Sequence, residues 1–283
     1  MISPLCLPGR SKYMTFKQWN PKHLTTFNSS ASSDFLESYN SYVEQQIKSD
    51  MERIPHKTFA ASSFRCERWS WFRLRGSVPK ATTIDSDLNF TAEIGTACHR
   101  IIQNNLVNLL GSDWISVQDH IASIEFPYTY TLESHDTGVE SMIQIEEPPI
   151  RFACDGIIRM NGMKYLLEIK TSEYSAWKNL DEPKPHHIDQ VKCYATLLQL
   201  PNVLFLYQDR QYGGLKCFEI KISSYEMQEV KDKFYRVMDL AKKNLAPDPL
   251  PIGDKWCTPS MCPYYSLCGD YGRDFGQKFR YNM

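Results

Sequence analysis

Hydrophobic and polar positions along the chain follow two repeats, a period of about 3.6 residues that is typical of helices and a period of two that is typical of strands. The helical period predicts helices over 34–51, 91–110, 187–199 and 223–245. Short apolar runs between turn residues predict strands, which are expected near 121–130, within 150–170, at 203–207 and at 215–222. Strands and helices mixed in this order predict an α/β fold.

The dipeptide Asn161-Gly162 stands between two apolar runs and predicts a two-residue type I′ turn, because both of its positions need a positive φ. Counting outward from this turn places Asp155 opposite Glu168, with Lys170 on the same face of the hairpin. Two facing carboxylates repel each other unless a cation lies between them. The hairpin therefore predicts a site for a divalent metal ion, and the competing interpretation is a surface strand with solvated charges.

A net charge of −1 means that any affinity for nucleic acid must come from local patches of the surface. We find no apolar run long enough to span a bilayer and no secretory signal, so we expect a cytoplasmic protein without a membrane partner. Residues 1–33 carry Arg10, Lys12, Lys17 and Lys22 and no acid, which weakly resembles an organellar transit peptide and leaves an organellar location open. A plain N-terminal extension is the favoured interpretation.

Nine cysteines without a secretion signal favour ligation of a metal or a cluster over a disulfide framework. Three of them, Cys257, Cys262 and Cys268, are close in the sequence, and Cys66 stands alone far upstream. The others lie in or beside apolar segments and are expected to be small buried hydrophobic residues: Cys6, Cys98, Cys154, Cys193 and Cys217.

Residues 57–80 hold six basic residues and one acid, interleaved with aromatic residues. Basic side chains that follow phosphates and rings that stack on bases would make a surface for single-stranded DNA, and Arg65, Arg68 and Trp69 are its candidate contacts. A helix with buried aromatic rings and solvated arginines explains the same pattern equally well.

The candidate residues occur in a characteristic order. Gly95 and His99 are followed by Asp155-Gly156, by Glu168-Ile169-Lys170 and by Gln190 with Tyr194. This ordered set resembles the PD-(D/E)xK nuclease superfamily, specifically its RecB-like branch, over roughly residues 60–270. The resemblance implies a restriction-endonuclease-like core, in which a mixed central sheet is flanked by helices, and an enzyme that hydrolyses DNA.

Hydrolysis of a phosphodiester needs an activated water and a cation that neutralises the charge growing on the phosphate, and bound Mg²⁺ or Mn²⁺ supplies both. Asp155 and Glu168 offer the hard oxygen ligands that these ions prefer. Lys170 would orient or help to deprotonate the water, which makes these three the expected catalytic residues. The resemblance adds the Ile169 carbonyl and the His99 imidazole as metal ligands, and Gln190 and Tyr194 as DNA contacts or braces of the site.

Cys66 together with the three cysteines of 257–268 is similar to the iron-sulfur staple of the AddB nuclease domain and of CRISPR-associated exonucleases. Four thiolates suit a [4Fe–4S] cluster and also Zn²⁺. One distant and three close cysteines differ from the paired spacing of a zinc ribbon, so the cluster is the favoured interpretation and zinc stays open. The cluster would be structural and would clamp the C-terminal segment onto the segment around Cys66.

The expected organisation is an N-terminal extension with an amphipathic helix over 1–56 and a nuclease domain over 57–283, whose segment 252–283 binds the cluster. The expected function is metal-dependent exonuclease activity on single-stranded or frayed-end DNA, in recombination, repair, phage DNA metabolism or spacer acquisition, in a bacterial or phage-encoded protein. No phosphate-binding loop of a motor occurs in the sequence, so a helicase or a recombination or CRISPR protein is an expected partner. The alternative is a non-catalytic or weakly catalytic DNA-binding subunit of a larger complex.

Overall fold

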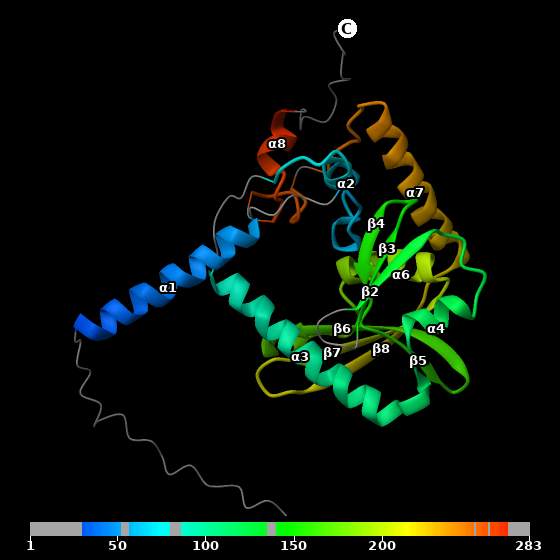
Figure 1. The fold of residues 1–283 in the computed structure, drawn as a ribbon, viewed down its shortest axis with the longest axis horizontal. Coiled ribbons are helices and arrows are strands. Elements are labelled where there is room, and N and C mark those ends of the chain that lie inside the picture. The colour runs from blue at the N-terminus through cyan, green and yellow to red at the C-terminus, as the bar shows by residue number, and fades with distance from the viewer. Residues whose placement is uncertain are drawn as a thin grey trace, which may run out of the picture. The chain divides into compact units, whose positions relative to one another are not determined.

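The central feature of the fold is a five-stranded mixed sheet with the strand order β1-β5-β6-β7-β8 (Figure 1). The structure, a computed structural model, describes residues 30–51, 57–79, 86–134, 140–251, 253–259 and 261–270. Strands β6 and β7 are parallel, and the other neighbours are antiparallel. The strands are β1 (Trp114–Ile115), β5 (Gly156–Met160), β6 (Met163–Ser172), β7 (Asn202–Asp209) and β8 (Leu215–Lys221). The predicted α/β class with a mixed central sheet is confirmed.

The β5–β6 hairpin has the register that its turn predicts. Asn161 and Gly162 both have positive φ values, 52° and 78°. Met160 pairs with Met163 next to the turn, and the last pair of the ladder joins Gly156 to Leu167. Strand β6 then continues to Ser172 without β5 beside it. One edge of β6 is therefore without a strand partner after Leu167. Asp155 comes directly before β5 and lies where this pairing stops.

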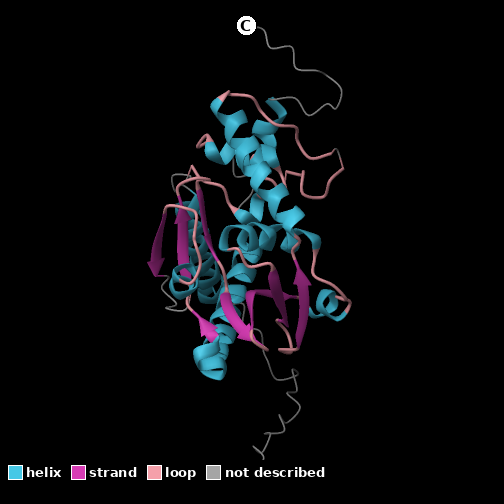
Figure 2. Cartoon of the chain, turned by 90° about the vertical axis from the view of Figure 1, so that its right-hand side faces the viewer, coloured by secondary structure: helices cyan, strands magenta, loops and turns pink. Residues whose placement is uncertain are grey.

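The structure corrects the prediction that one hairpin spans 150–170. Residues 150–153 form β4, which pairs with β3 in a separate three-stranded sheet of order β2-β3-β4. Figure 2 shows the strands in two groups with helices between them. The chain passes from one sheet to the other at Cys154 and Asp155. The strands of the smaller sheet are β2 (Tyr130–Ser134), β3 (Ser141–Ile145) and β4 (Ile150–Ala153).

The strand predicted near 121–130 is wrong over most of its length, because helix α4 (Val117–Ala122) occupies its start and β2 begins only at Tyr130. The Ser116 hydroxyl accepts a hydrogen bond from the Asp119 backbone N–H at 3.0 Å and so caps this helix. Val117 and Ile121 are both buried and four residues apart, which places them on one helical face.

Helices cover both faces of the large sheet. Alternate residues of β6 point to opposite sides, so Leu167 and Ile169 pack with Ile102 of α3, whereas Leu166 belongs to the core that also holds Val191 of α6. Helix α3 (Ser86–Leu110) starts five residues before the predicted helix and ends at the predicted residue, directly before Gly111, which has a φ of 53°. Helix α6 spans Pro185–Leu198, close to its prediction.

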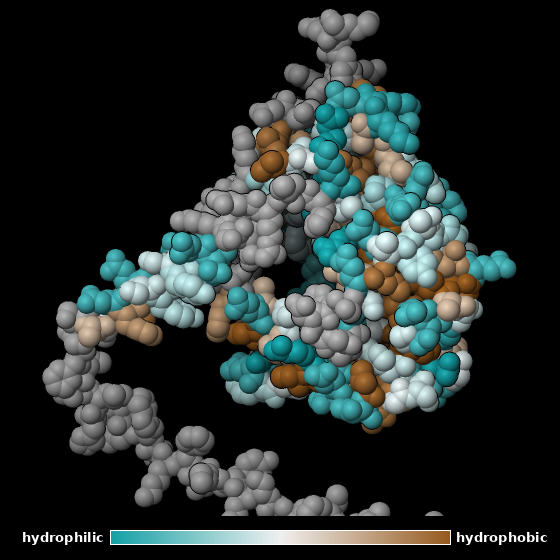
Figure 3. Space-filling view, viewed as in Figure 1, coloured by the Kyte–Doolittle hydropathy of each residue, from teal (hydrophilic) through white to brown (hydrophobic). Residues whose placement is uncertain are grey.

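The predicted helix from Ser223 is confirmed as α7 (Ser224–Lys242), and Ser223 and Glu226 form its capping box. The remaining helices are α2 (Glu67–Leu74), α5 (Tyr174–Lys178) and α8 (Tyr265–Asp270), with short 3₁₀ turns at Ala61–Ser63 and Gly111–Asp113. None of the helices that the structure describes is both long and apolar enough to cross a membrane. The face drawn in Figure 3 mixes hydrophilic and hydrophobic residues.

The chain divides into two units, 1–45 and 46–283. Helix α1 (Ser30–Met51) starts four residues before the predicted helix. Its side chains Phe35, Leu36, Tyr39 and Tyr42 are exposed, whereas Val43 and Ile47 are partly buried. The predicted boundary after residue 56 stays a prediction.

Candidate metal centre and cysteine pocket

Asp155 is fixed at the point where the β5–β6 ladder ends. Its Oδ2 accepts a hydrogen bond of 2.6 Å from the backbone N–H of Ile169 on β6. The carboxylate thus occupies the place of a backbone partner on the open edge of β6 and joins the end of β5 to that strand. Its second oxygen, Oδ1, lies 3.4 Å from Nδ1 of His99.

His99 reaches this carboxylate from helix α3. The helix lies close to β6, because an added Cβ at Gly95 would stand 3.2 Å from Oγ1 of Thr171. Burial by itself lowers the pKa of His99, but the hydrogen bond and the negative charge of Asp155 more than offset it, so the pKa is raised. The negative charge of Asp155 therefore favours a positive charge at this place, which a proton on the imidazole can supply.

Glu140 joins the site, and the sequence did not predict it. One ligand atom each of His99, Glu140 and Asp155 lies within 4.8 Å of the others. The fully buried side chain of Gln103 connects two of these residues, because its Nε2 donates to Oε1 of Glu140 and to the backbone carbonyl of Asp155, each at 2.8 Å. Two carboxylates and an imidazole make an oxygen-rich donor set that suits Mg²⁺ or Mn²⁺.

A signal for Gln103 was present in the sequence. It follows His99 by four residues, which places both side chains on one face of the predicted helix. Glu140 offered no such signal, because it stands alone in a polar stretch that carries neither the helical nor the strand period.

Glu168 and Lys170 form a buried ion pair beside this group. The Lys170 Nζ lies 2.5 Å from Oε1 of Glu168, whose side chain is only 2% exposed. Burial raises the pKa of Glu168 to about 7, although the charge of Lys170 opposes the rise. The carboxylate of Glu168 contacts Lys170 and is not among the three groups that converge, so its role as a metal ligand stays a prediction, as does that of the Ile169 carbonyl.

Lys170 is also held from helix α6. Its Nζ donates to Oε1 of Gln190 at 3.1 Å, and Nε2 of Gln190 donates to the Tyr194 hydroxyl at 2.8 Å. Tyr194 is 6% exposed and stacks on Phe152 with ring centroids 5.1 Å apart. Of the two roles expected for Gln190 and Tyr194, bracing the site is the one that this geometry fits.

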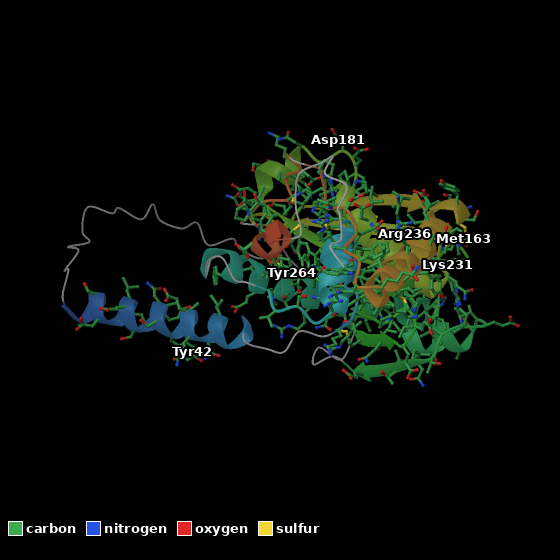
Figure 4. All side chains as sticks on the ribbon, turned by 90° about the horizontal axis from the view of Figure 1, so that it is seen from above. Tyr42, Met163, Asp181, Lys231, Arg236 and Tyr264 are labelled. Atoms are coloured by element: carbon green, nitrogen blue, oxygen red, sulfur yellow. The ribbon has the colours of Figure 1, made fainter. Side chains whose placement is uncertain are left out.

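The four predicted cluster cysteines line one pocket. Cys66 precedes α2, and Cys257, Cys262 and Cys268 come from the C-terminal segment that packs on it. The ring of Tyr264 stacks on Phe72 of α2, with centroids 5.1 Å apart, and lies beside α8 in Figure 4. Residues about 200 positions apart in the sequence thus meet at one pocket. We call this the cysteine pocket.

The prediction that Arg68 contacts DNA is corrected, because its side chain is 1% exposed. Its Nε donates to the Pro247 carbonyl at 2.6 Å, and its Nη1 lies 3.6 Å from Sγ of Cys268. Arg65 pairs with Asp254 at 3.1 Å, and Trp69 packs edge-on against Tyr264 at 6.3 Å while lining the cysteine pocket. The roles of Arg65 and Trp69 in DNA binding stay predictions.

The other cysteines divide into two groups. Cys154 and Cys193 are buried as predicted, and burial raises the pKa of each thiol. Cys217 is exposed, because its side chain points outward from β8, and the prediction for it is wrong. Cys98 is half-buried, and Cys6 lies outside the described residues.

No protein-family profile matches the chain, and no curated protein does. Among solved structures, the chain is similar to SSO0001, with 16% identity, a TM-score of 0.45, and coverage of 83% of this chain and 98% of that one. It is also similar to an alkaline exonuclease, LHK-Exo, from Laribacter hongkongensis, with 16% identity, a TM-score of 0.35, and coverage of 67% and 90%. For the complex of LHK-Exo with dAMP the identity is 14% and the TM-score is 0.34, and the match covers 66% of this chain and 89% of that one. At these values the likeness is weak, and the function rests on the site itself.

Proposed function

We propose that this chain is a metal-dependent deoxyribonuclease of the RecB-like branch of the PD-(D/E)xK superfamily, acting as an exonuclease on single-stranded or frayed-end DNA. The observation that carries the proposal is the convergence of His99, Glu140 and Asp155 within 4.8 Å beside the Glu168–Lys170 pair. The order of His99, Asp155, Glu168 and Lys170 in the sequence supports the same assignment. A surface strand with solvated charges does not fit, because Glu168 is 2% exposed.

A bound Mg²⁺ or Mn²⁺ would neutralise charge on the phosphate and lower the pKa of a water molecule. His99, Glu140 and Asp155 would hold the ion, with Glu168 and the Ile169 carbonyl as further candidates. The Lys170 ammonium is the only predicted catalytic cation, and Gln190 and Glu168 fix its position from two sides. Held there, it can orient the attacking water and stabilise the negative charge of the transition state without moving.

The cysteine pocket supports the further proposal of a [4Fe–4S] cluster bound by Cys66, Cys257, Cys262 and Cys268. The residues present fit such a group, because all four cysteines line one pocket and Nη1 of Arg68 lies 3.6 Å from Sγ of Cys268. Zn²⁺ takes the same four ligands, so metal analysis has to separate the two.

The decisive experiment is a digest of single-stranded DNA labelled at the 5′ or the 3′ end. We expect hydrolysis with Mg²⁺ or Mn²⁺ and none with EDTA, and the label that is released first gives the polarity. A protein that binds the strand but leaves it intact with either metal would instead be the DNA-binding subunit of a larger complex.

Replacing Glu140 by glutamine should weaken metal binding by about 10- to 100-fold. The amide keeps an acceptor for Gln103, so the change removes charge and leaves the hydrogen bond in place. Mn²⁺ affinity measured by titration calorimetry tests this, with Glu133→Gln on β2 as the matched control. An unchanged Mn²⁺ affinity would exclude Glu140 from the metal centre.

A further inference from the structure

Three aromatic side chains form a connected cluster where β6 and β7 end. Tyr174 and Trp177 belong to α5, and Tyr212 lies in the turn between β7 and β8. The rings of Tyr174 and Trp177 stack with centroids 6.2 Å apart, and the ring of Tyr212 meets Tyr174 edge-on at 5.0 Å. We call these three residues the aromatic platform.

The platform has a rigid base, which is Trp177. Its Nε1 donates to the Tyr207 carbonyl at 3.2 Å, and Nζ of Lys216 lies 4.9 Å from the centre of its ring. The ring rests directly on the turn backbone, since a Cβ added at Gly214 would stand 2.8 Å from Cη2 of Trp177. A partner that stacks on this cluster would meet rings that are already ordered, which lowers the entropy cost of binding.

The outer rings of the platform are open to solvent. Tyr212 is 70% exposed and Tyr174 is 36% exposed, whereas most of the aromatic rings of the large core are buried. Folding therefore gains little from the Tyr212 ring. An exposed aromatic face held in place is the feature that proteins use to stack the bases of unpaired strands, because every base has a π face.

The platform lies at the same end of the sheet as the metal centre. Tyr174 follows Lys170 by four residues, so the chain between their Cα atoms spans at most about 14 Å. Strands β6 and β7 are parallel, so the turn that carries Tyr212 leaves the sheet at that end as well. Open α/β sheets bind their ligands at the carboxyl ends of parallel strands.

Two cations border the platform. The backbone N–H of Arg210 donates to the Ser172 carbonyl at 3.0 Å, and its Nη1 reaches the Thr91 carbonyl at 3.4 Å. Nζ of Lys216 donates to the carbonyls of Lys178 and Leu180. Both side chains donate to neutral carbonyl groups, so their positive charges remain available to the phosphates of a strand that lies on the rings.

We propose that the aromatic platform is a base-stacking subsite, which holds an unpaired DNA strand whose neighbouring phosphate lies at the metal centre. This subsite rests on the proposed nuclease function and deepens it, because it requires the bases next to the cleaved bond to be unpaired. Tyr212 and Tyr174 would contact the bases, and Trp177 would position Tyr174.

The test measures binding of a labelled thymidine oligonucleotide to the full chain by fluorescence anisotropy, with Ca²⁺ in place of Mg²⁺ and the oligonucleotide checked for integrity on a gel. We expect Tyr212→Ala to weaken binding by about 5- to 150-fold, the range for loss of one stacked base. Tyr212→Phe keeps the ring and should bind like the unchanged protein. Tyr225→Ala, an equally exposed tyrosine on α7, is the control.

A second probe is an oligonucleotide with one abasic position, moved stepwise from the end. The unchanged protein should lose affinity at one position, and Tyr212→Ala should lose none there. If Tyr212→Ala binds every oligonucleotide as tightly as the unchanged protein while that protein still cleaves DNA with Mg²⁺, the platform is excluded and the nuclease function stands. A protein that neither binds nor cleaves the strand overturns both.

Discussion

Replacing Lys170 by methionine should lower the rate of DNA hydrolysis at least about a hundredfold, the usual cost of losing one fixed group that stabilises the transition state. Methionine keeps most of the length of the side chain but removes the ammonium that Glu168 and Gln190 hold in place. Burial already raises the pKa of Glu168, so without its partner this carboxyl takes up a proton and stays neutral. The fold should therefore survive the change.

Cleavage rates with saturating Mg²⁺ measure the effect of Lys170→Met, and circular dichroism checks the fold. Lys221→Met is the matched control, because Lys221 is an exposed lysine on β8, two strands away from β6 in the same sheet. Asp155→Asn should be as inactive, since the amide still accepts the Ile169 hydrogen bond but has lost its charge. Undiminished cleavage by the Asp155→Asn, Lys170→Met double variant would end the proposed mechanism.

Replacing Cys268 by serine should remove the bound cluster and loosen the C-terminal segment on α2. Binding of a structural metal by four ligands contributes on the order of 10 kcal/mol. The stack of Tyr264 on Phe72 and the hydrogen bond from Arg68 to Pro247 would remain. The unchanged protein should be brown and contain iron, and Cys268→Ser should be colourless with a lower melting temperature. Cys217→Ser, in an exposed position on β8, should keep the iron and the colour.

Loss of the cluster should also disturb the metal centre and so lower the cleavage rate. The ring of Trp256, next to Cys257, lies 4.7 Å from that of His186 in the first turn of α6. The same helix carries Gln190, which holds Lys170. Cleavage by Cys268→Ser should fall together with its stability. A colourless unchanged protein with stoichiometric zinc would refute the cluster and leave the same segment stapled by zinc.

The hairpin was predictable because its information is local. Asn161-Gly162 fixes the turn, and the turn fixes every pair back to Gly156. The break just before that residue was not predictable, since Ile150, Phe152 and Ile157 are all buried and read as one apolar run. A period of two says which side chains point inward, but it does not say which sheet they point into.

Some residues of the metal centre could likewise be predicted from the sequence, and one could not. His99, Asp155, Glu168 and Lys170 stand in a recognisable order, so the sequence located them. Glu140 comes to them only through the smaller sheet, whose pairing of β3 with β4 no local pattern revealed. The role of Arg68 was missed for a related reason, because a charged residue in a basic segment gives no sign that its partners lie about 180 and 200 residues away.

The hydrogen bond from Ile169 to Asp155 gives this protein an internal reporter. One amide proton in the middle of the sheet is bound to the carboxylate that is proposed to hold the ion, so its resonance senses both the strand and the metal centre. When an ion draws charge from Asp155, that proton loses part of its acceptor, and its chemical shift and exchange with solvent change. Occupancy of the site is thus readable by nuclear magnetic resonance at a single peptide group, even in a variant that cleaves nothing.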